Sequence, residues 1–359
     1  MKWIFAALSL ALATPLAAAD VAMRAEYHPP TNLFILMDEA ALWYPGYNDT
    51  AHREAWTARF GWSADDQAMA RRYKNYRKRT FDDSDQTNKA ERLRRDGVFS
   101  TGASINPDTD PLAQHFIAAE SVDAALSAFD TIASADDAAM LREFYDHFSP
   151  EWRALLEESE AFAAQAARLD EELSDETVGA FATRMAAFYG VEADQSFRTR
   201  LVWWPAIDRT FAFLKGATFL LYRHPERHAA ENDRAEIVMH EAAHYFSASQ
   251  PSERKRRLTE AFFEICPART QNLHHFLEEP LAVAWGQAAF AKYGRGEPLD
   301  PSTNWYRPPI PDVMGRLLWL HVDRIYETDA TIEDGVVLEA ASYCARLLEI
   351  GRALKRKRW

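Results

Sequence analysis

Glycine and proline are scarce in this chain of 359 residues, with 13 and 17 copies spread along its length. Their scarcity, together with 48% hydrophobic and 26% charged residues, excludes a collagenous, low-complexity or disordered chain and indicates a globular protein. Basic residues are also outnumbered, 41 Lys and Arg against 54 Asp and Glu, which gives a formal charge of −13. Such a surface repels phosphate backbones and anionic lipid. We therefore expect no nucleic-acid partner and interpret the basic segment Lys355–Arg358 as a solvated tail.

Long apolar runs are absent beyond residue 19, so the sequence predicts no membrane span. Before that point, Lys2 is followed by an apolar stretch interrupted only by Ser9 and Thr14, and the stretch closes with small residues up to Ala19. One positive charge, a short apolar run and a small-residue end are typical of a cleaved secretory signal. We therefore predict that residues 1–19 are a signal peptide and that the protein is exported, either periplasmic or secreted.

The chain has only two cysteines, Cys266 and Cys344. In the oxidising compartment expected for an exported protein they could form one disulfide. Spacing alone does not decide whether they pair, so both the bridged and the unbridged form stay open from the sequence.

Amphipathic helical patterns dominate the chain before residue 195, with Ala, Leu and aromatic residues at intervals of three and four. The predicted helices are 51–78, 112–129, 139–148, 152–169 and 177–189. The polar stretch 101–111, rich in Gly, Asn, Asp and Pro, predicts a loop between the first two of these helices.

Two later segments, 197–204 and 211–222, are rich in Phe, Leu, Val, Thr and Trp and predict a small antiparallel sheet. Five prolines make residues 298–311 an extended loop, after which helices resume at Val313 and continue, with a break near Gly335, to the end. The expected fold is mainly α, of the α+β class: a helical bundle with a small antiparallel sheet. We expect a helical N-terminal region, 20–195, and a second region, 196–359, which either stand apart or form one continuous domain.

The most specific pattern in the sequence is His-Glu-x-x-His, from His240 to His244. Asp233, with Glu236 three residues later, forms a capping-box arrangement that predicts a helix around the motif. On a helix the two histidines lie one turn apart on the same face, where both imidazoles can bind one zinc ion. Glu241 lies beside them and is placed to accept a proton from a metal-bound water. The alternative is a histidine pair that faces solvent on an ordinary helix.

A catalytic zinc site needs a third protein ligand and an open position for water. Gln250 stands where the last histidine of the long metzincin motif would fall, which excludes that family. The Glu-Pro-Leu-Ala segment that opens at Glu279 resembles the glutamate-bearing second helix of the gluzincins, a group of zinc peptidases. The resemblance covers residues 217–290 and implies a zincin-like catalytic core with Glu279 as third ligand. Because Pro280 disfavours helical geometry at Glu279, Glu278 is the alternative ligand, and a third reading has both acids facing solvent.

The gluzincin resemblance implies hydrolysis of a peptide or protein substrate, with Glu241 as the proton carrier. It also implies a later Tyr or His that stabilises the oxyanion, for which Tyr306 and His321 are the candidates. The strand before the motif helix, expected at 217–222, would pair with extended substrate. Residues 216–222 lack the acidic anchor that an aminopeptidase needs for the free amino group, so endopeptidase action is favoured.

Other residues and another class of function stay open. His274 and His275 precede the acid pair by about one turn and are interpreted as ligands, as supporting groups or as histidines of a polar face. Cys266 is not expected to bind metal, because its position does not match a deformylase-like arrangement, in which the cysteine precedes the motif. The alternative to an enzyme is a non-catalytic zinc-binding or scaffold protein with a degenerate site, in which residues 20–195 serve as an interaction module.

Overall fold

The computed structural model describes residues 21–42, 50–81, 110–192, 194–205, 210–226, 234–266, 274–300, 302–328, 330–333 and 335–356. The predicted signal peptide (1–19), the predicted cap residue Asp233 and nearly all of the predicted loop 101–111 lie outside the described residues. None of the helices in the described part of the chain combines the length and the apolar character needed to span a bilayer.

The described chain is mainly helical, as predicted. Before the central strands the helices are α1 (Pro29–Ala41), α2 (Ala51–Phe60), α3 (Ala64–Thr80), α6 (Pro111–Ala118), α7 (Val122–Ser127), α8 (Ala135–His147), α9 (Ser149–Ser159), α10 (Phe162–Leu173) and α11 (Glu176–Tyr189). Three predicted helices are each split in two, since breaks fall at 61–63, 119–121 and 160–161. At the first break Gly61 has a φ of 83°, a conformation that favours glycine and ends the helix.

The C-terminal half contains α12 (Ala235–Ser249), α13 (Ser252–Ile265), α15 (Glu279–Val283), α16 (Pro309–Tyr326) and α17 (Val336–Arg356). Two π-helical segments, His274–Glu278 and Ala284–Gly294, flank α15 and make one continuous helical stretch with it. The prediction of an extended loop up to Pro311 is wrong at its end, because α16 begins at Pro309. Proline is favoured in the first turn of a helix, where its missing N–H has no partner to lose.

The four-stranded sheet is mixed, and the prediction of a purely antiparallel sheet is wrong. Its strands are β1 (Ala22–Glu26), β2 (Ser196–Trp203), β3 (Phe211–Lys215) and β4 (Thr218–Arg223), in the order β1-β2-β4-β3. Only the β3–β4 hairpin is antiparallel, while β1 with β2 and β2 with β4 pair in parallel. The chain crosses from β1 to β2 through the helices α1 to α11, and such a long crossover permits parallel pairing.

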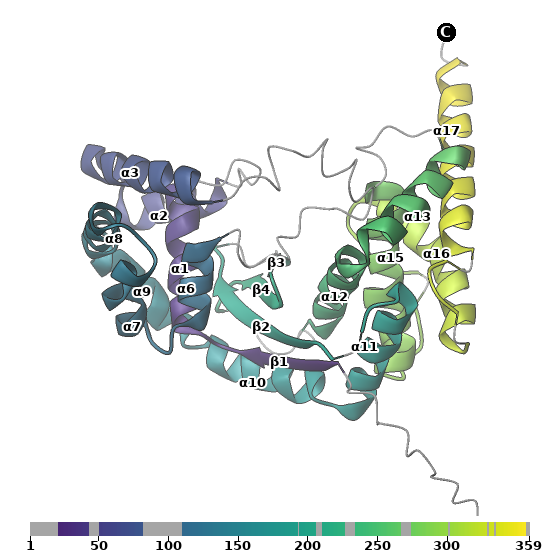
Figure 1. Cartoon of the computed structure of the whole chain (residues 1–359), viewed down its shortest axis with the longest axis horizontal. Coiled ribbons are helices and arrows are strands. Elements are labelled where there is room, and N and C mark those ends of the chain that lie inside the picture. The colour runs from purple at the N-terminus through teal and green to yellow at the C-terminus, as the bar shows by residue number, and fades with distance from the viewer. Residues whose placement is uncertain are drawn as a thin grey trace, which may run out of the picture.

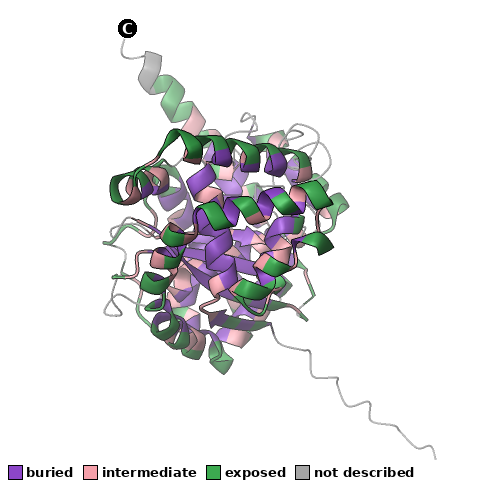
Figure 2. Ribbon diagram, turned by 90° about the vertical axis from the view of Figure 1, so that its left-hand side faces the viewer, coloured by how far each residue is buried: buried purple, intermediate pink, exposed green. Residues whose placement is uncertain are grey.

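The sheet lies between two groups of helices (Figure 1). Helices α1 to α3 and α6 to α9 stand on one side, α11 to α17 stand on the other, and α10 runs along β1, where Asp170 accepts a hydrogen bond from the Ala25 backbone N–H at 2.8 Å. Figure 2 shows the helices of the first group turning buried faces inward and exposed faces to solvent. The predicted boundary at 195/196 falls between α11 and β2, and the pairing of β1 with β2 crosses it.

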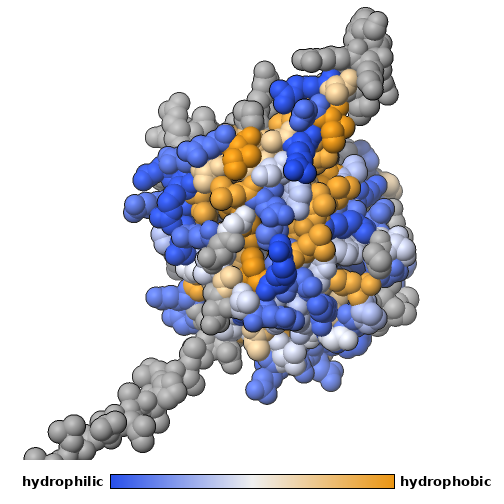
Figure 3. Space-filling view, turned by 90° about the vertical axis from the view of Figure 1, so that its right-hand side faces the viewer, coloured by the Kyte–Doolittle hydropathy of each residue, from blue (hydrophilic) through white to orange (hydrophobic). Residues whose placement is uncertain are grey.

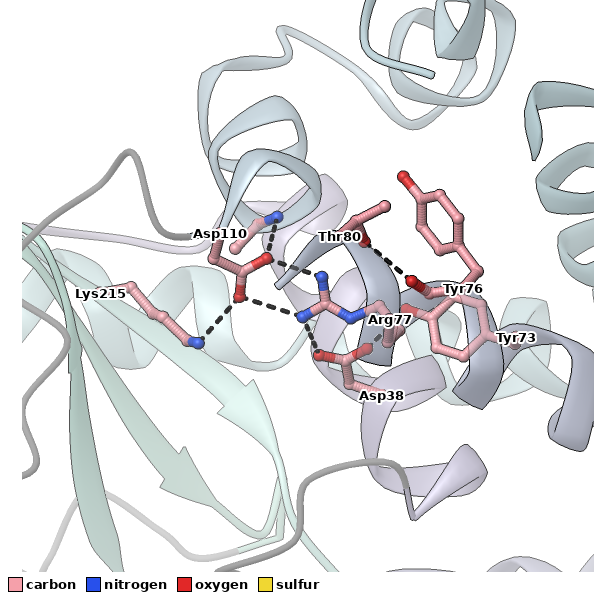
Figure 4. A network of polar contacts seen from close by, with 8 residues as sticks. Asp38, Tyr73, Tyr76, Arg77, Thr80, Asp110 and Lys215 are labelled. Atoms are coloured by element: carbon pink, nitrogen blue, oxygen red, sulfur yellow. Dashed lines mark hydrogen bonds and ion pairs between the residues drawn. The ribbon is translucent and has the colours of Figure 1, made fainter. Parts of the chain in front are cut away.

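A buried ion network joins the first group of helices to the sheet (Figure 4). Arg77 of α3 is fully buried and donates hydrogen bonds to both oxygens of Asp110, at 2.6 and 3.0 Å, and to Asp38 of α1 at 3.0 Å. Lys215, at the end of β3, donates to Asp110 at 3.0 Å. Burial alone would raise the pKa of the Asp110 carboxyl, but Arg77 and Lys215 hold it well below its usual range. The network therefore fixes the β3 end of the sheet to α1 and α3.

The two cysteines form a disulfide, which decides the question that the sequence left open. Cys266, directly after α13, is bonded to Cys344 of α17 with a Cα–Cα distance of 5.9 Å. The bridge lies on the side of the molecule formed by the C-terminal helices, and both cysteines are fully buried. Figure 3 views that side and shows hydrophobic patches among hydrophilic residues. Helix α16 has three exposed apolar side chains, Ile310, Val313 and Leu320.

Candidate metal centre

Helix α12 carries the two motif histidines on one face. His240 and His244 are 5% and 9% exposed, and their Nε2 atoms lie 3.1 Å apart. The helix begins after Arg234, which has a φ of 69° and provides no side-chain cap, so the described residues at the start of α12 form no capping box. The Glu236 carboxylate instead accepts a hydrogen bond from Arg295, at 3.3 Å. The predicted helix and the predicted face of the two histidines are thus both present.

Glu279, the first residue of α15, brings a carboxylate to the two histidines. Its Oε1 lies 3.4 Å from His240 Nε2, and its Oε2 lies 3.3 Å from His244 Nε2. The three residues each offer one ligand atom within 4.8 Å of the others. Glu279 is 6% exposed. Burial alone would raise the pKa of its carboxyl, but His240, His244 and His274 hold it well below the usual range.

The spacing of the candidate donor atoms suits a small tetrahedral metal ion. The two Nε2 atoms lie 3.1 Å apart, and each lies close to a different oxygen of Glu279, His240 Nε2 3.4 Å from Oε1 and His244 Nε2 3.3 Å from Oε2. In a tetrahedron with the ~2.0–2.1 Å metal–ligand distances typical of zinc, neighbouring donors stand about 3.3 Å apart. Two imidazoles and one carboxylate also form the donor set of catalytic zinc in several hydrolases. The His240–His244–Glu279 group can therefore hold a metal ion, to which these described residues would offer three ligands.

The expectation that Pro280 disfavours helical geometry at Glu279 is wrong, because Glu279 is the first residue of α15. Glu278 has helical torsion angles, φ −68° and ψ −55°, and the chain is helical on both sides of it. In a regular α-helix the proline ring would clash with the carbonyl four residues earlier. The π-helical turn His274–Glu278 has a wider hydrogen-bond spacing, which changes the position of that carbonyl and lets Pro280 lie in the first turn of α15. This local geometry directs Glu279, and not Glu278, toward His240.

A glycine on the second π-helical segment lets it approach α12 closely. A Cβ atom added at Gly286 would lie 2.6 Å from both the Cα and the backbone N of His240. Any larger residue would therefore push the two helices apart. The next residue, Gln287, places its Oε1 3.5 Å from His240 Nδ1, on the side of the ring that faces away from Glu279. Sequence reasoning missed both residues, because no local motif marks them.

Glu278 and His274 lie behind the three candidate ligands. Glu278 is 2% exposed, with Oε1 3.6 Å from His244 Nδ1 and Oε2 3.4 Å from His274 Nδ1. His274 Nε2 lies 3.0 Å from Glu279 Oε2. Burial would lower the pKa of His274, but the two carboxylates outweigh it and raise the pKa to about 9. His275, its neighbour, is exposed.

Glu241 follows His240 on α12 and has a side chain that is only partly exposed. The pKa of its carboxyl is raised, chiefly because its surroundings exclude water and also because Glu279 carries a like charge, while His244 and His240 act in the opposite direction. A carboxyl of raised pKa beside a metal site suits a group that accepts a proton and later returns it.

The two oxyanion candidates lie in different surroundings. Tyr306 stacks on His240 with ring centroids 5.4 Å apart and an interplanar angle of 13°, and its backbone N–H donates to Asp312 at 2.9 Å. His321 of α16 forms an ion pair with Glu339 of α17 and lies 3.2 Å from Arg324. The structure thus brings Tyr306 to the candidate ligands, whereas the contacts of His321 join α16 to α17.

The strand expected to bind substrate is already paired on both sides. Of the expected strand 217–222, residues 218–222 fall on β4, which lies between β2 and β3. Its backbone is therefore committed to the sheet, and the prediction that this strand pairs with substrate is wrong. The hairpin turns back after β3, so β3 takes the outer position and packs beside α12.

A comparison of the chain with models of protein families, with curated proteins and with solved structures finds no match to any of the three.

Proposed function

We propose that this protein is an exported zinc-dependent hydrolase with a zincin-like, gluzincin-type core, and that it cleaves peptide bonds. The observation that carries the proposal is the buried His240–His244–Glu279 group with Glu241 next to it. A structural zinc site usually takes four protein ligands, whereas a catalytic one takes three and keeps an open position. Three ligands with an acid beside them therefore favour hydrolysis over a purely structural metal.

Each group at the site has a separate role in the proposed hydrolysis. A bound zinc ion supplies a water of lowered pKa and a positive charge opposite a developing oxyanion. Glu241 accepts a proton and passes it to the leaving amine, a role that its raised pKa supports. Tyr306, stacked on His240, is the candidate to stabilise the oxyanion. Peptide bonds are the proposed substrate because of the gluzincin resemblance, and the absence of an acidic residue from 216–222 favours internal cleavage.

The test separates metal binding from chemistry. Glu241→Gln keeps the size of the side chain but cannot accept a proton, so we expect this variant to fold, to bind one zinc ion and to lose at least ~10²-fold in hydrolysis of an unfolded protein substrate. His240→Ala should lose the metal as well as the activity. Glu260→Gln, the same substitution at an exposed position of α13, is the matched control and should behave as the parent.

The same experiment distinguishes the proposed hydrolase from the alternative of a non-catalytic zinc-binding or scaffold protein. A parent protein that binds zinc but cleaves none of a set of unfolded proteins and peptides would favour that alternative. Equal hydrolysis by the parent and by Glu241→Gln would contradict the mechanism proposed here. Metal analysis of the purified parent comes first, because both the zinc hydrolase and the zinc-binding alternative require stoichiometric zinc.

A further inference from the structure

His274 completes a closed ring of contacts at one side of the candidate metal centre, a ring that includes His244 and Glu279 but not His240. The ring passes from His244 Nδ1 to Glu278 (3.6 Å), from Glu278 to His274 Nδ1 (3.4 Å), from His274 Nε2 to Glu279 (3.0 Å) and from Glu279 back to His244 Nε2 (3.3 Å). His274 contacts the carboxylates of both Glu278 and Glu279 and is not itself a candidate ligand. Within the described part of the chain, no other member of the ring combines these two properties.

The two oxygens of Glu279 have different surroundings. Oε2 lies 3.0 Å from His274 Nε2 and 3.3 Å from His244 Nε2, so it is the oxygen that contacts His274. Oε1 has its contact with His240 Nε2, at 3.4 Å. A hydrogen bond from an imidazole N–H to one carboxylate oxygen reduces the ability of that oxygen to bind a cation, and it fixes the plane of the carboxylate.

The position of His274 is itself fixed. Its Nδ1 lies near the buried Glu278 carboxylate, and its ring stacks on that of His244 with centroids 6.1 Å apart and an interplanar angle of 28°. The side chain is 37% exposed, so only one part of the ring meets solvent. The π-helical turn that places His274 five residues before Glu279 directs both side chains to the same side of the helix.

We propose that His274 is a positioning residue: it holds Glu279 so that a single oxygen, Oε1, binds the metal ion, and it thereby keeps a coordination position open. The inference rests on the metal site proposed above. Without His274, the carboxylate is free to turn and to offer both oxygens, and a carboxylate bound through both occupies the position that a water or a substrate carbonyl needs.

The test uses the full mature chain loaded with cobalt or zinc. Cobalt(II) in place of zinc reports the coordination number, because its visible absorption is stronger with four ligands than with five. In His274→Ala we expect this absorption to weaken toward the five-coordinate pattern, and we expect zinc affinity, measured by competition with a chromophoric chelator, to fall about 10–100-fold. His275→Ala, at the exposed neighbouring position, is the matched control and should keep both the parent spectrum and the parent affinity.

A second variant gives the proposal a rescue experiment. Glutamine reaches about as far as the histidine Nε2 and retains an N–H donor, so His274→Gln should restore most of the affinity and the parent-like cobalt spectrum. His274→Gln also keeps the proposal testable if His274→Ala does not fold. The proposal is overturned if the cobalt spectra of His274→Ala and His275→Ala are the same, or if the parent is already five-coordinate through both oxygens of Glu279. A parent that binds no metal would instead overturn the proposed function, so the two failures are distinguishable.

Discussion

At residue 286 the absence of a side chain sets the distance between the two helices that build the metal site. His240 comes from α12 and Glu279 from the helical stretch that continues through Gly286, so the separation of these helices fixes the separation of the ligands. The Cβ–Cα distance of 2.6 Å that any other residue would create is shorter than real contacts allow. The ligand geometry thus depends on a residue that has no chemistry of its own.

Gly286→Ala should therefore weaken the site. The added methyl group meets backbone atoms of His240, which cannot move without displacing the ligand, so we expect a loss of about 1–3 kcal/mol in the free energy of unfolding and a fall of at least tenfold in zinc affinity. Urea unfolding with chelator present and chelator competition measure the two effects separately.

The control for this substitution, Gly351→Ala, is expected to change stability in the opposite direction. Gly351 lies in α17, and an added Cβ there meets nothing within 4 Å. Gly351→Ala should stabilise the protein by about 0.5–1 kcal/mol, because alanine loses less conformational freedom in a helix, and it should leave zinc affinity unchanged. A Gly286→Ala protein that matches Gly351→Ala in both measurements would show that the close approach of the helices is not required.

At the scale of elements, local signals predicted most of the helices, although α1 and α13 were missed, and features that depend on non-local contacts were not predicted. Helix α12 could be predicted because the spacing of its apolar residues and of its two histidines is contained in the segment itself. Strand β1 could not, because its five residues become a strand only by pairing with β2, in a register that joins Ala22 to Ser196. The parallel direction of these strands likewise depends on a crossover of many helices.

Glu279 lies beside the two histidines, as the prediction of it as third ligand requires, but its local geometry was not predicted. Whether Glu278 or Glu279 faces the histidines depends on the rotation of their helix, and the π-helical turn before Pro280 sets that rotation. No residue type marks a π-helical turn in a sequence, so the pattern around the two acids left both open. The contacts of His274 escaped for the same reason.

Helix α3 offers a matched comparison of a buried and an exposed ion pair. Arg77→Ala removes a fully buried partner and leaves Asp110 and Asp38 without their main countercharge, so we expect a loss of about 3–5 kcal/mol in the free energy of unfolding. Arg79 lies one half-turn further along α3, pairs with Asp137 and has a side chain that is 58% exposed. Arg79→Ala should therefore lower the free energy of unfolding by only about 0–1 kcal/mol. Denaturant unfolding of both variants measures the difference, and equal losses would contradict the role given to the buried network.

At the scale of the whole molecule, the disulfide and the metal site act on overlapping parts of the chain. The bridge joins residues 78 positions apart, and the loop that it closes contains α15 and therefore Glu279. The two histidines lie on α12, before the loop begins. The bridge therefore limits where Glu279 can go in the unfolded chain, while a metal ion bound at the candidate site would tie that loop to α12 only in the folded protein.

Removing the bridge should accordingly lower global stability and spare the folded site. In the chain-entropy model a loop of this length contributes about 4 kcal/mol, which corresponds to a fall of roughly 5 °C in Tm for a chain of this size. We expect the double variant Cys266→Ala/Cys344→Ala to show that fall with chelator present, and to keep a zinc affinity within about threefold of the parent, since neither sulfur lies among the candidate ligands. Thiol labelling of the exported parent without reductant, which should find no free cysteine, is the control for the bridge itself.

Because zinc is expected to bind only the folded state, the stabilisation by zinc should add to that by the bridge. A zinc-dependent increase in Tm that disappears when the bridge is removed would mean that the disulfide shapes the folded site.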